Sequence, residues 1–199
     1  MTVERERILR DLRDGNERYV RERGAELVGG VPGVVPVHRP VAVVIGCSDA
    51  RVPVEQVFDQ PPGSLFIVRV AGHVLEPAAL ASVLYATREL EVRLVIVLGH
   101  QSCGAVCAAL SGTDDEALRP LVAPIAARLS RMGDAGVCED SAVRANAGAA
   151  VAEVQEYLLE SAPELAGQVT VCGAVKALDS GEVEWLDVAR TSLPQKYPG

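Results

Sequence analysis

Two short apolar runs, each ending in glycine, constrain the fold of this chain more than any other feature. Val41–Ile45 precedes Gly46, and Leu94–Leu98 precedes Gly99. Continuous runs of this length, rich in β-branched residues and bounded by turn residues, are typical of strands that are buried on both faces, as in a parallel sheet. The two runs therefore predict a fold of the α/β class.

Side chains that bind metals follow each run at once. Cys47 comes directly after the first glycine, and His100 and Cys103 follow the second. Sites in open α/β sheets form outside the carboxyl ends of the strands, so neighbouring strands would bring these three side chains together. Thiolate and imidazole groups bind zinc well, and three protein ligands leave a fourth position open, as in catalytic sites. The pattern predicts a metal site.

The remaining chain alternates predicted helices with predicted strands. It favours a mainly parallel central sheet flanked by helices, with an N-terminal helical arm (1–23) and a C-terminal antiparallel hairpin, in a single domain over 1–199. Predicted strands cover 64–70, as a second buried strand, and 93–98. The hairpin uses 168–174 and 182–188, and the loops are 24–40, 71–73 and 133–138. Predicted helices cover 3–22, 54–58, 76–90, 104–110 and 116–132, with a long one capped at Asp140-Ser141.

Composition narrows the class of protein. The 199 residues carry a net charge of -8 and no basic stripe, which argues against binding to nucleic acid. No apolar run approaches the roughly 20 residues that span a membrane, and the charged N-terminus does not resemble a secretion signal. We therefore expect a cytoplasmic protein with reduced thiols among its five cysteines. Cys107, Cys138 and Cys172 are expected to be small buried residues.

Two motifs carry a resemblance to a known family. Cys47-Ser-Asp49-Ala-Arg51 together with His100-Gln-Ser-Cys103-Gly104 resembles the paired zinc motif of the β-class carbonic anhydrases. Residues 12–20, 58–73, 81–86 and 178–181 are similar to further segments of that family, so the resemblance covers nearly the whole chain.

The resemblance implies a site and a reaction. Cys47, His100 and Cys103 would hold one Zn2+ per chain, and a zinc-bound hydroxide would attack carbon dioxide to give bicarbonate and a proton. Asp49 would accept a hydrogen bond from that hydroxide, and Arg51 would hold Asp49 ionised and away from the metal. In some members of the family this carboxylate becomes the fourth ligand of a closed state. The alternative role for Asp49 and Arg51 is an ordinary ion pair within a loop.

Substrate positions follow from the same resemblance. Phe66, Tyr85 and Gly104 match positions in the substrate region, although core packing is an alternative role for the two aromatic residues. His38 stands where the family usually has a glutamine that donates a hydrogen bond to substrate across a dimer interface. The family implies a homodimer or a dimer of dimers with sites at the subunit interface.

Other positions bear on regulation. Val52 and Arg69 match residues of members that bind bicarbonate at a regulatory pocket, whereas Val44 replaces an aromatic residue of that pocket. Ala50 and Val70 also depart from the common residues of the family.

Two alternative functions remain open at this point. One is an enzyme on the same scaffold that hydrolyses a related heterocumulene, carbonyl sulfide or carbon disulfide. The other is a zinc-binding or redox-sensing protein without turnover. In the enzyme, two thiolate ligands would cancel the formal charge of the zinc, so its bound water should be less acidic than at a zinc held by three neutral imidazoles. This predicts a hydration rate that rises toward alkaline pH.

Overall fold

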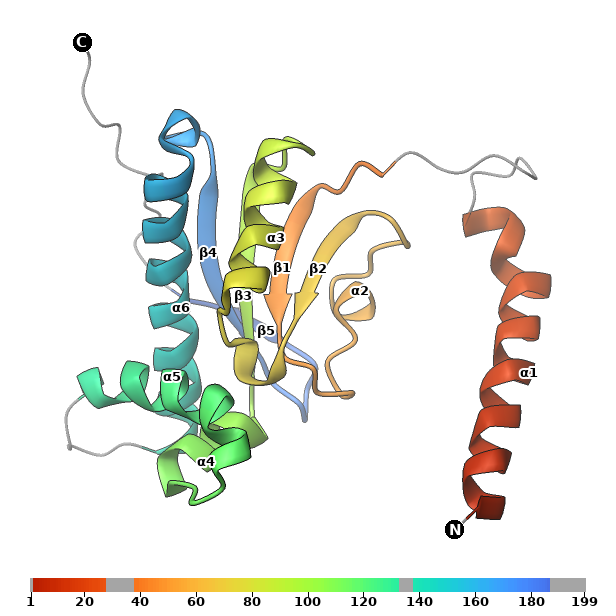
Figure 1. Cartoon of the computed structure of the whole chain (residues 1–199). Coiled ribbons are helices and arrows are strands. Elements are labelled where there is room, and N and C mark those ends of the chain that lie inside the picture. The colour runs from red at the N-terminus through yellow and green to blue at the C-terminus, as the bar shows by residue number, and fades with distance from the viewer. Residues whose placement is uncertain (1, 28–37, 133–137, 187–199) are drawn as a thin grey trace. The chain divides into compact units, whose positions relative to one another are not determined.

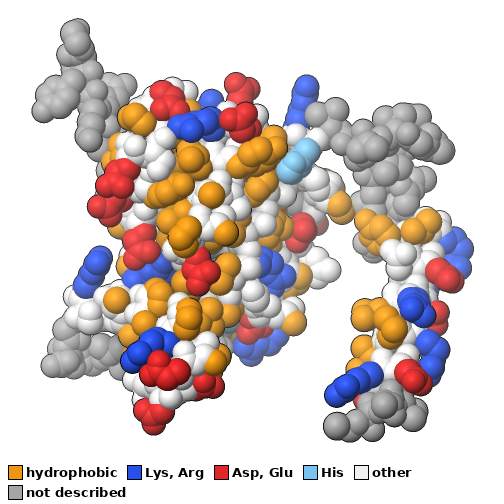
Figure 2. Space-filling model, in the orientation of Figure 1, with side chains coloured by type: hydrophobic (Ala, Val, Ile, Leu, Met, Phe, Trp, Pro, Cys, Tyr) orange, Lys and Arg blue, Asp and Glu red, His pale blue; other side chains and the backbone are white. Residues whose placement is uncertain are grey.

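The computed structural model describes residues 2–27, 38–132 and 138–186, in two compact units that are considered separately: Met1–His38 and Arg39–Gly199. The first unit contains the helix α1, Thr2–Leu27. It is longer than the predicted helix over 3–22, so the predicted loop does not begin at residue 24; residues 28–37 lie outside the described ranges. Hydrophobic side chains gather along one side of α1 and are exposed (Figure 2): Ile8, Leu9, Leu12, Tyr19 and Val20.

The second unit is built on one sheet (Figure 1). In the described residues the strands lie in the order β2-β1-β3-β4-β5. Their bounds are β1 Ala42–Gly46, β2 Leu65–Arg69, β3 Leu94–His100, β4 Thr170–Lys176 and β5 Val183–Trp185. Every neighbouring pair is parallel except β4 and β5, which are antiparallel. The predicted α/β class, mainly parallel sheet and C-terminal hairpin are confirmed.

Five α-helices of this unit are described: α2 Val54–Val57, α3 Pro77–Arg88, α4 Gly104–Ser111, α5 Arg119–Leu129 and α6 Glu139–Ser161. Short 3-10 turns cover Ala71–His73, Glu116–Leu118, Ser130–Met132 and Pro163–Leu165. The helix predicted over 116–132 is therefore divided, and its α-helical part begins just before Pro120, where a proline is tolerated. No described helix is long and apolar enough to cross a membrane.

The start of α6 differs from the prediction. Its N-cap is Cys138, whereas Asp140 and Ser141 lie in the first turn. The Ser141 hydroxyl accepts a hydrogen bond from the Cys138 backbone N–H at 3.0 Å, so serine supports the cap from the third helical position. Cys138 is exposed at this N-cap position, so the prediction that it is buried is wrong. Cys107 and Cys172 are half-buried.

Packing on the two faces of the sheet explains the apolar runs. Val43 and Ile45 of β1 face a large cluster that includes residues of α3, α5 and α6, and Figure 1 shows α3 and α6 on the same face of the sheet. Val44 faces a smaller cluster on the opposite side with Val54 of α2. β1 and β3 are buried on both faces, as predicted. β2 is an edge strand rather than a second buried strand: its first four residues are half-buried and its last, Arg69, is exposed.

Candidate metal centre

The ends of two neighbouring strands bring the candidate ligands together. β1 and β3 pair in parallel, with Gly46 opposite Leu98, so both strands end at the same edge of the sheet. Cys47 follows β1 directly, and His100 is the last residue of β3. The strand was predicted to end at residue 98. It continues because His100 still pairs with Lys176 of β4, which fixes the backbone of the histidine.

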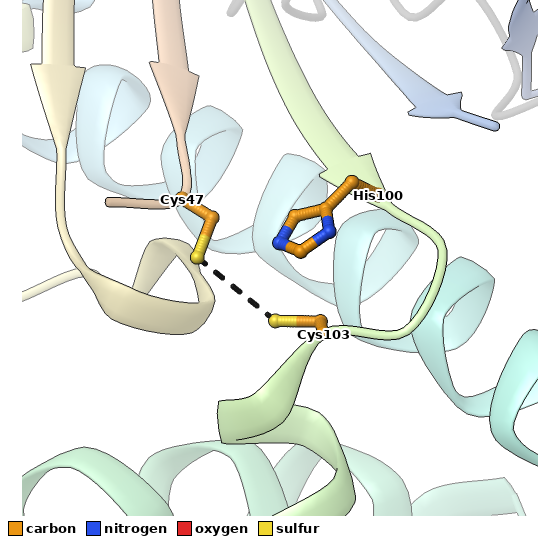
Figure 3. A group of neighbouring side chains, drawn as sticks. All are labelled: Cys47, His100 and Cys103. Carbon is orange, nitrogen blue, oxygen red and sulfur yellow. Dashed lines mark hydrogen bonds between the residues drawn. The ribbon is translucent and has the colours of Figure 1, made fainter. Parts of the chain in front are cut away.

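Cys47, His100 and Cys103 form a buried cluster, as predicted (Figure 3). One ligand atom from each side chain lies within 4.8 Å of the others. The two sulfur atoms are 4.0 Å apart. Two thiolates bound to one tetrahedral zinc at about 2.3 Å each would be about 3.8 Å apart, so the observed spacing fits a shared ion.

The ring of His100 presents one nitrogen to this cluster. Nδ1 lies 2.8 Å from the backbone oxygen of Gln101 and donates to it, which leaves Nε2 with a lone pair. Nε2 is buried and has no hydrogen-bond partner among the described residues. Because buried polar atoms are nearly always satisfied, this orphan nitrogen beside two thiols fits a metal ligand.

The two sulfur atoms lie within hydrogen-bonding distance of each other, and either can donate. The hydrogen bond with Cys103 lowers the pKa of the Cys47 thiol, and the backbone N–H of Gly72, 3.3 Å from the sulfur, lowers it further. The pKa of Cys103 is raised because its proton is held by the Cys47 sulfur and because the group is buried. A divalent cation would replace that proton, since metal binding requires both thiolates.

Asp49 lies beside the cluster in a tight pair with Arg51. Arg51 Nη2 is 2.7 Å from Asp49 Oδ2, and Arg51 Nε is 3.0 Å from Oδ1. These bonds hold the pKa of the carboxyl well below its ordinary value. Asp49 Oδ2 lies 4.0 Å from Nε2 of His100, and Arg51 Nη2 also donates to the backbone oxygen of Ser102 at 3.2 Å. The carboxylate therefore borders the cluster, while the guanidinium binds both of its oxygens.

Arg69 holds the loop that carries these groups. Its Nε donates to the backbone oxygen of Cys47 at 2.9 Å, and its Nη2 donates to that of Asp49 at 2.6 Å. Val44 and Val52 are fully buried in the core. The bicarbonate role predicted for Arg69 and Val52 stays a prediction. The contact of Gly72 with the Cys47 sulfur was missed by sequence reasoning, although a glycine in Ala71-Gly72-His73 straight after a strand was a signal for a special turn.

The predicted substrate residues are placed in part. Phe66 is half-buried on β2, and Tyr85 on α3 is 52% exposed, with ring centroids 6.3 Å apart. This exposure contradicts core packing for Tyr85. Gly104 is exposed at the first position of α4. His38 is exposed and belongs to the other unit, so its role at the site stays a prediction.

Comparison with known proteins gives one consistent family. The family model described as carbonic anhydrase matches residues 42–183. Carbonic anhydrase 2 of Mycobacterium tuberculosis is 46% identical over 110 residues, which cover 54% of this chain and 53% of that protein. The carbonic anhydrase of Pseudomonas aeruginosa is 31% identical over 196 residues, which cover 91% of this chain and 89% of that protein. The chain thus spans about half the length of the mycobacterial relative it matches and most of the pseudomonad one.

Solved structures share the fold. The β-carbonic anhydrase CafA of Aspergillus fumigatus superposes with a TM-score of 0.72 at 26% identity, covering 94% of this chain and 93% of that one. The Coccomyxa β-carbonic anhydrase in complex with acetazolamide gives a TM-score of 0.71 at 25% identity, covering 90% of this chain and 84% of that one. Family, fold and the Cys-His-Cys cluster thus agree.

Proposed function

The chain belongs to the β-carbonic anhydrase family, and from this premise we propose that it is a zinc-dependent enzyme that hydrates carbon dioxide reversibly to bicarbonate and a proton. The observation that carries the proposal is the buried cluster of Cys47, His100 and Cys103, in which an imidazole nitrogen without a hydrogen-bond partner among the described residues lies beside two thiols. These three residues would hold the ion. Zinc bound there would lower the pKa of a water ligand and so supply a nucleophile.

Asp49 and Arg51 would orient the reacting water. An ionised Asp49 accepts hydrogen bonds only, so its Oδ2, which borders the metal position, would accept a hydrogen bond from the water and orient a lone pair of that water toward carbon dioxide. Arg51 keeps this carboxylate ionised through two short bonds. Asp49 would reach the metal as a fourth ligand only after those bonds break, so the observed pair favours the open state.

Substrate would enter near the exposed Tyr85 and the edge strand β2, with Phe66 and Gly104 lining the approach. We propose a homodimer or a dimer of dimers. Two features of this chain support assembly: the exposed apolar side of α1 and the half-buried residues on the open edge of β2. Two β-carbonic anhydrases of Sordaria macrospora with this fold are described as tetrameric.

The test is stopped-flow hydration of carbon dioxide on protein of measured zinc content, from mildly acid to alkaline pH. We expect one zinc per chain and a rate that rises with pH, and Cys47→Ser should abolish both zinc binding and activity. Cys138→Ser is the matched control, because serine caps helices well and Cys138 lies outside the cluster.

Other outcomes point to the alternative functions. One zinc per chain with no hydration at any pH would refute the proposal, and turnover of carbonyl sulfide would then identify the heterocumulene hydrolase. A chain with zinc that turns over neither substrate would be a binding or sensing protein. A rate that is flat with pH would overturn the expected effect of the two thiolates.

A further inference from the structure

The turn Ala71–His73 packs directly against the metal cluster. Figure 3 shows the backbone that follows β2 passing beside Cys47, and the Gly72 N–H donates to the Cys47 sulfur at 3.3 Å. Gly72 has a φ of 61° and His73 a φ of 45°, in the left-handed region. A Cβ on Gly72 would lie 2.5 Å from Cδ1 of Ile125. The turn therefore has an unfavourable backbone conformation, which contacts with other parts of the unit must stabilise.

Asn146 of α6 holds this turn through its amide nitrogen. Nδ2 lies 3.2 Å from the backbone oxygen of Gly72 and 2.9 Å from Nε2 of His73. The direction of the amide is fixed because its Oδ1 accepts a hydrogen bond from Arg128 Nη1 at 3.0 Å. Asn146 therefore donates to both atoms of the turn, and Nε2 of a neutral His73 accepts.

Arg128 of α5 anchors Asn146 from the opposite side. Its Nε and Nη2 bind the two carboxylate oxygens of Glu153 at 3.0 and 2.6 Å. Arg128 is 3% exposed and Asn146 is fully buried. A buried charge is costly unless it is paired and its hydrogen bonds are satisfied. Here Nε, Nη1 and Nη2 of the guanidinium each donate to an oxygen of Glu153 or Asn146. The contacts run without a break from Glu153 to the sulfur of Cys47.

We propose that Asn146, held by Arg128, is a positioning residue for the metal ligand Cys47, acting through the Gly72 amide. The proposal rests on the proposed function, since it takes Cys47 as a zinc ligand. By fixing the backbone of Gly72, Asn146 keeps one N–H on the sulfur, which orients the remaining lone pairs and withdraws charge from the thiolate. Partners of this kind, one contact beyond the metal, tune affinity and geometry.

The test is Asn146→Ala, which removes both hydrogen bonds to the turn. We expect zinc affinity, measured by competition with a chelator, to fall about 10-fold. The sulfur-to-metal charge-transfer absorption of the cadmium-loaded protein should shift, because the N–H to sulfur bond is lost. The Gly72 amide of the metal-free protein should exchange with solvent faster than in the wild type.

The matched control is Leu158→Ala, which opens a cavity in the same helix about 18 Å further along its axis. It should lower the unfolding midpoint without changing zinc affinity, the cadmium spectrum or Gly72 exchange. If Asn146→Ala does not fold, Glu153→Gln is the second variant. It keeps the shape of the carboxylate but weakens the ion pair with Arg128, which in turn holds Asn146. Its effects should be smaller but in the same direction.

The inference fails if the folded Asn146 or Glu153 variant matches the Leu158 control in all three measurements. It is supported if zinc affinity and Gly72 exchange change together. If the wild-type protein bound no zinc, the proposed function would fail, whereas Gly72 exchange in the metal-free protein would still decide whether Asn146 holds the turn.

Discussion

Two histidines lie in the core of this molecule at nearly equal burial, and their surroundings give them opposite properties. His73 is 1% exposed and His100 is 0% exposed, and each has one ring nitrogen without a partner among the described residues. Burial and the positive charge of Arg128 lower the pKa of His73 to about 3. Burial lowers the pKa of His100 too, but the Cys47 sulfur and the backbone oxygen of Gln101 outweigh it and raise the pKa overall.

The difference shows which surroundings suit a buried histidine to bind a metal. His100 faces a thiol of lowered pKa and the carboxylate of Asp49, so its surroundings attract a cation. His73 faces the Asn146 amide, with Arg128 behind it, so its surroundings repel one. Equal burial thus leaves one imidazole ready to bind a metal and keeps the other neutral within a hydrogen-bonded turn.

The largest expected effect separates the two histidines directly. His100→Gln should lose bound zinc and reduce carbon dioxide hydration to background, because a primary amide is a poor zinc ligand. His73→Gln should keep one zinc per chain, since glutamine can still accept the hydrogen bond from Asn146. Metal analysis and stopped-flow kinetics of both variants test this. Equal loss of zinc in the two variants would break the comparison.

This contrast also shows which parts of the candidate site can be predicted from the sequence. Cys47, His100 and Cys103 were predictable together because each depends on a strand end that a local pattern marks, Gly46 or Gly99. Because β1 and β3 are neighbouring parallel strands, their ends lie together regardless of how the helices pack. The α/β class and the hairpin followed from the same local patterns.

The surroundings of His73 were not predictable in this way. Ala71–His73 was expected to be only a loop, because its burial depends on α5 and α6 packing over it. Arg128 and Asn146 are polar residues at inward helix positions, and their partners are distant in sequence. Which polar side chains meet in a core is decided by tertiary packing, and this one sequence carries no local signal for it.

The next effect concerns the anion that faces His100. Asp49→Asn should lower kcat by about 100-fold while zinc stays bound, because the amide keeps the shape but is no longer a charged acceptor for the hydrogen bond of the attacking water. The matched control is Arg51→Lys, which leaves the carboxylate in place but removes the two-point contact, and it should cost less. Stopped-flow rates at equal zinc content measure both. Full activity in Asp49→Asn would reduce this pair to an ordinary ion pair.

A smaller effect is expected from His73 in acid. Its pKa is about 3 in the folded protein and near 6.5 when exposed, so between these values the unfolded chain binds more protons. The stability contributed by neutral His73 is therefore complete above pH 6.5 and is lost as the pH falls toward 3. Metal-free wild type should lose about 1.4 kcal/mol more per pH unit than His73→Gln in this window. Urea unfolding at several pH values tests this. If the free energy of unfolding depends on pH equally in the wild type and the variant, folding does not lower the pKa of His73.

The smallest effect tests whether charge matters outside the core. Arg144 and Glu184 form an ion pair with Nη2 and Oε2 2.6 Å apart, but their side chains are 44% and 53% exposed. Water screens such pairs, so Glu184→Gln should change the free energy of unfolding by less than about 1 kcal/mol and leave zinc affinity unchanged. A loss of zinc in this variant would mean that the charge of Glu184 on β5 affects zinc binding at the cluster from a distance. The contrast between His73 and His100 would then have to be explained by the charge of the whole unit, because the groups in direct contact would no longer account for it.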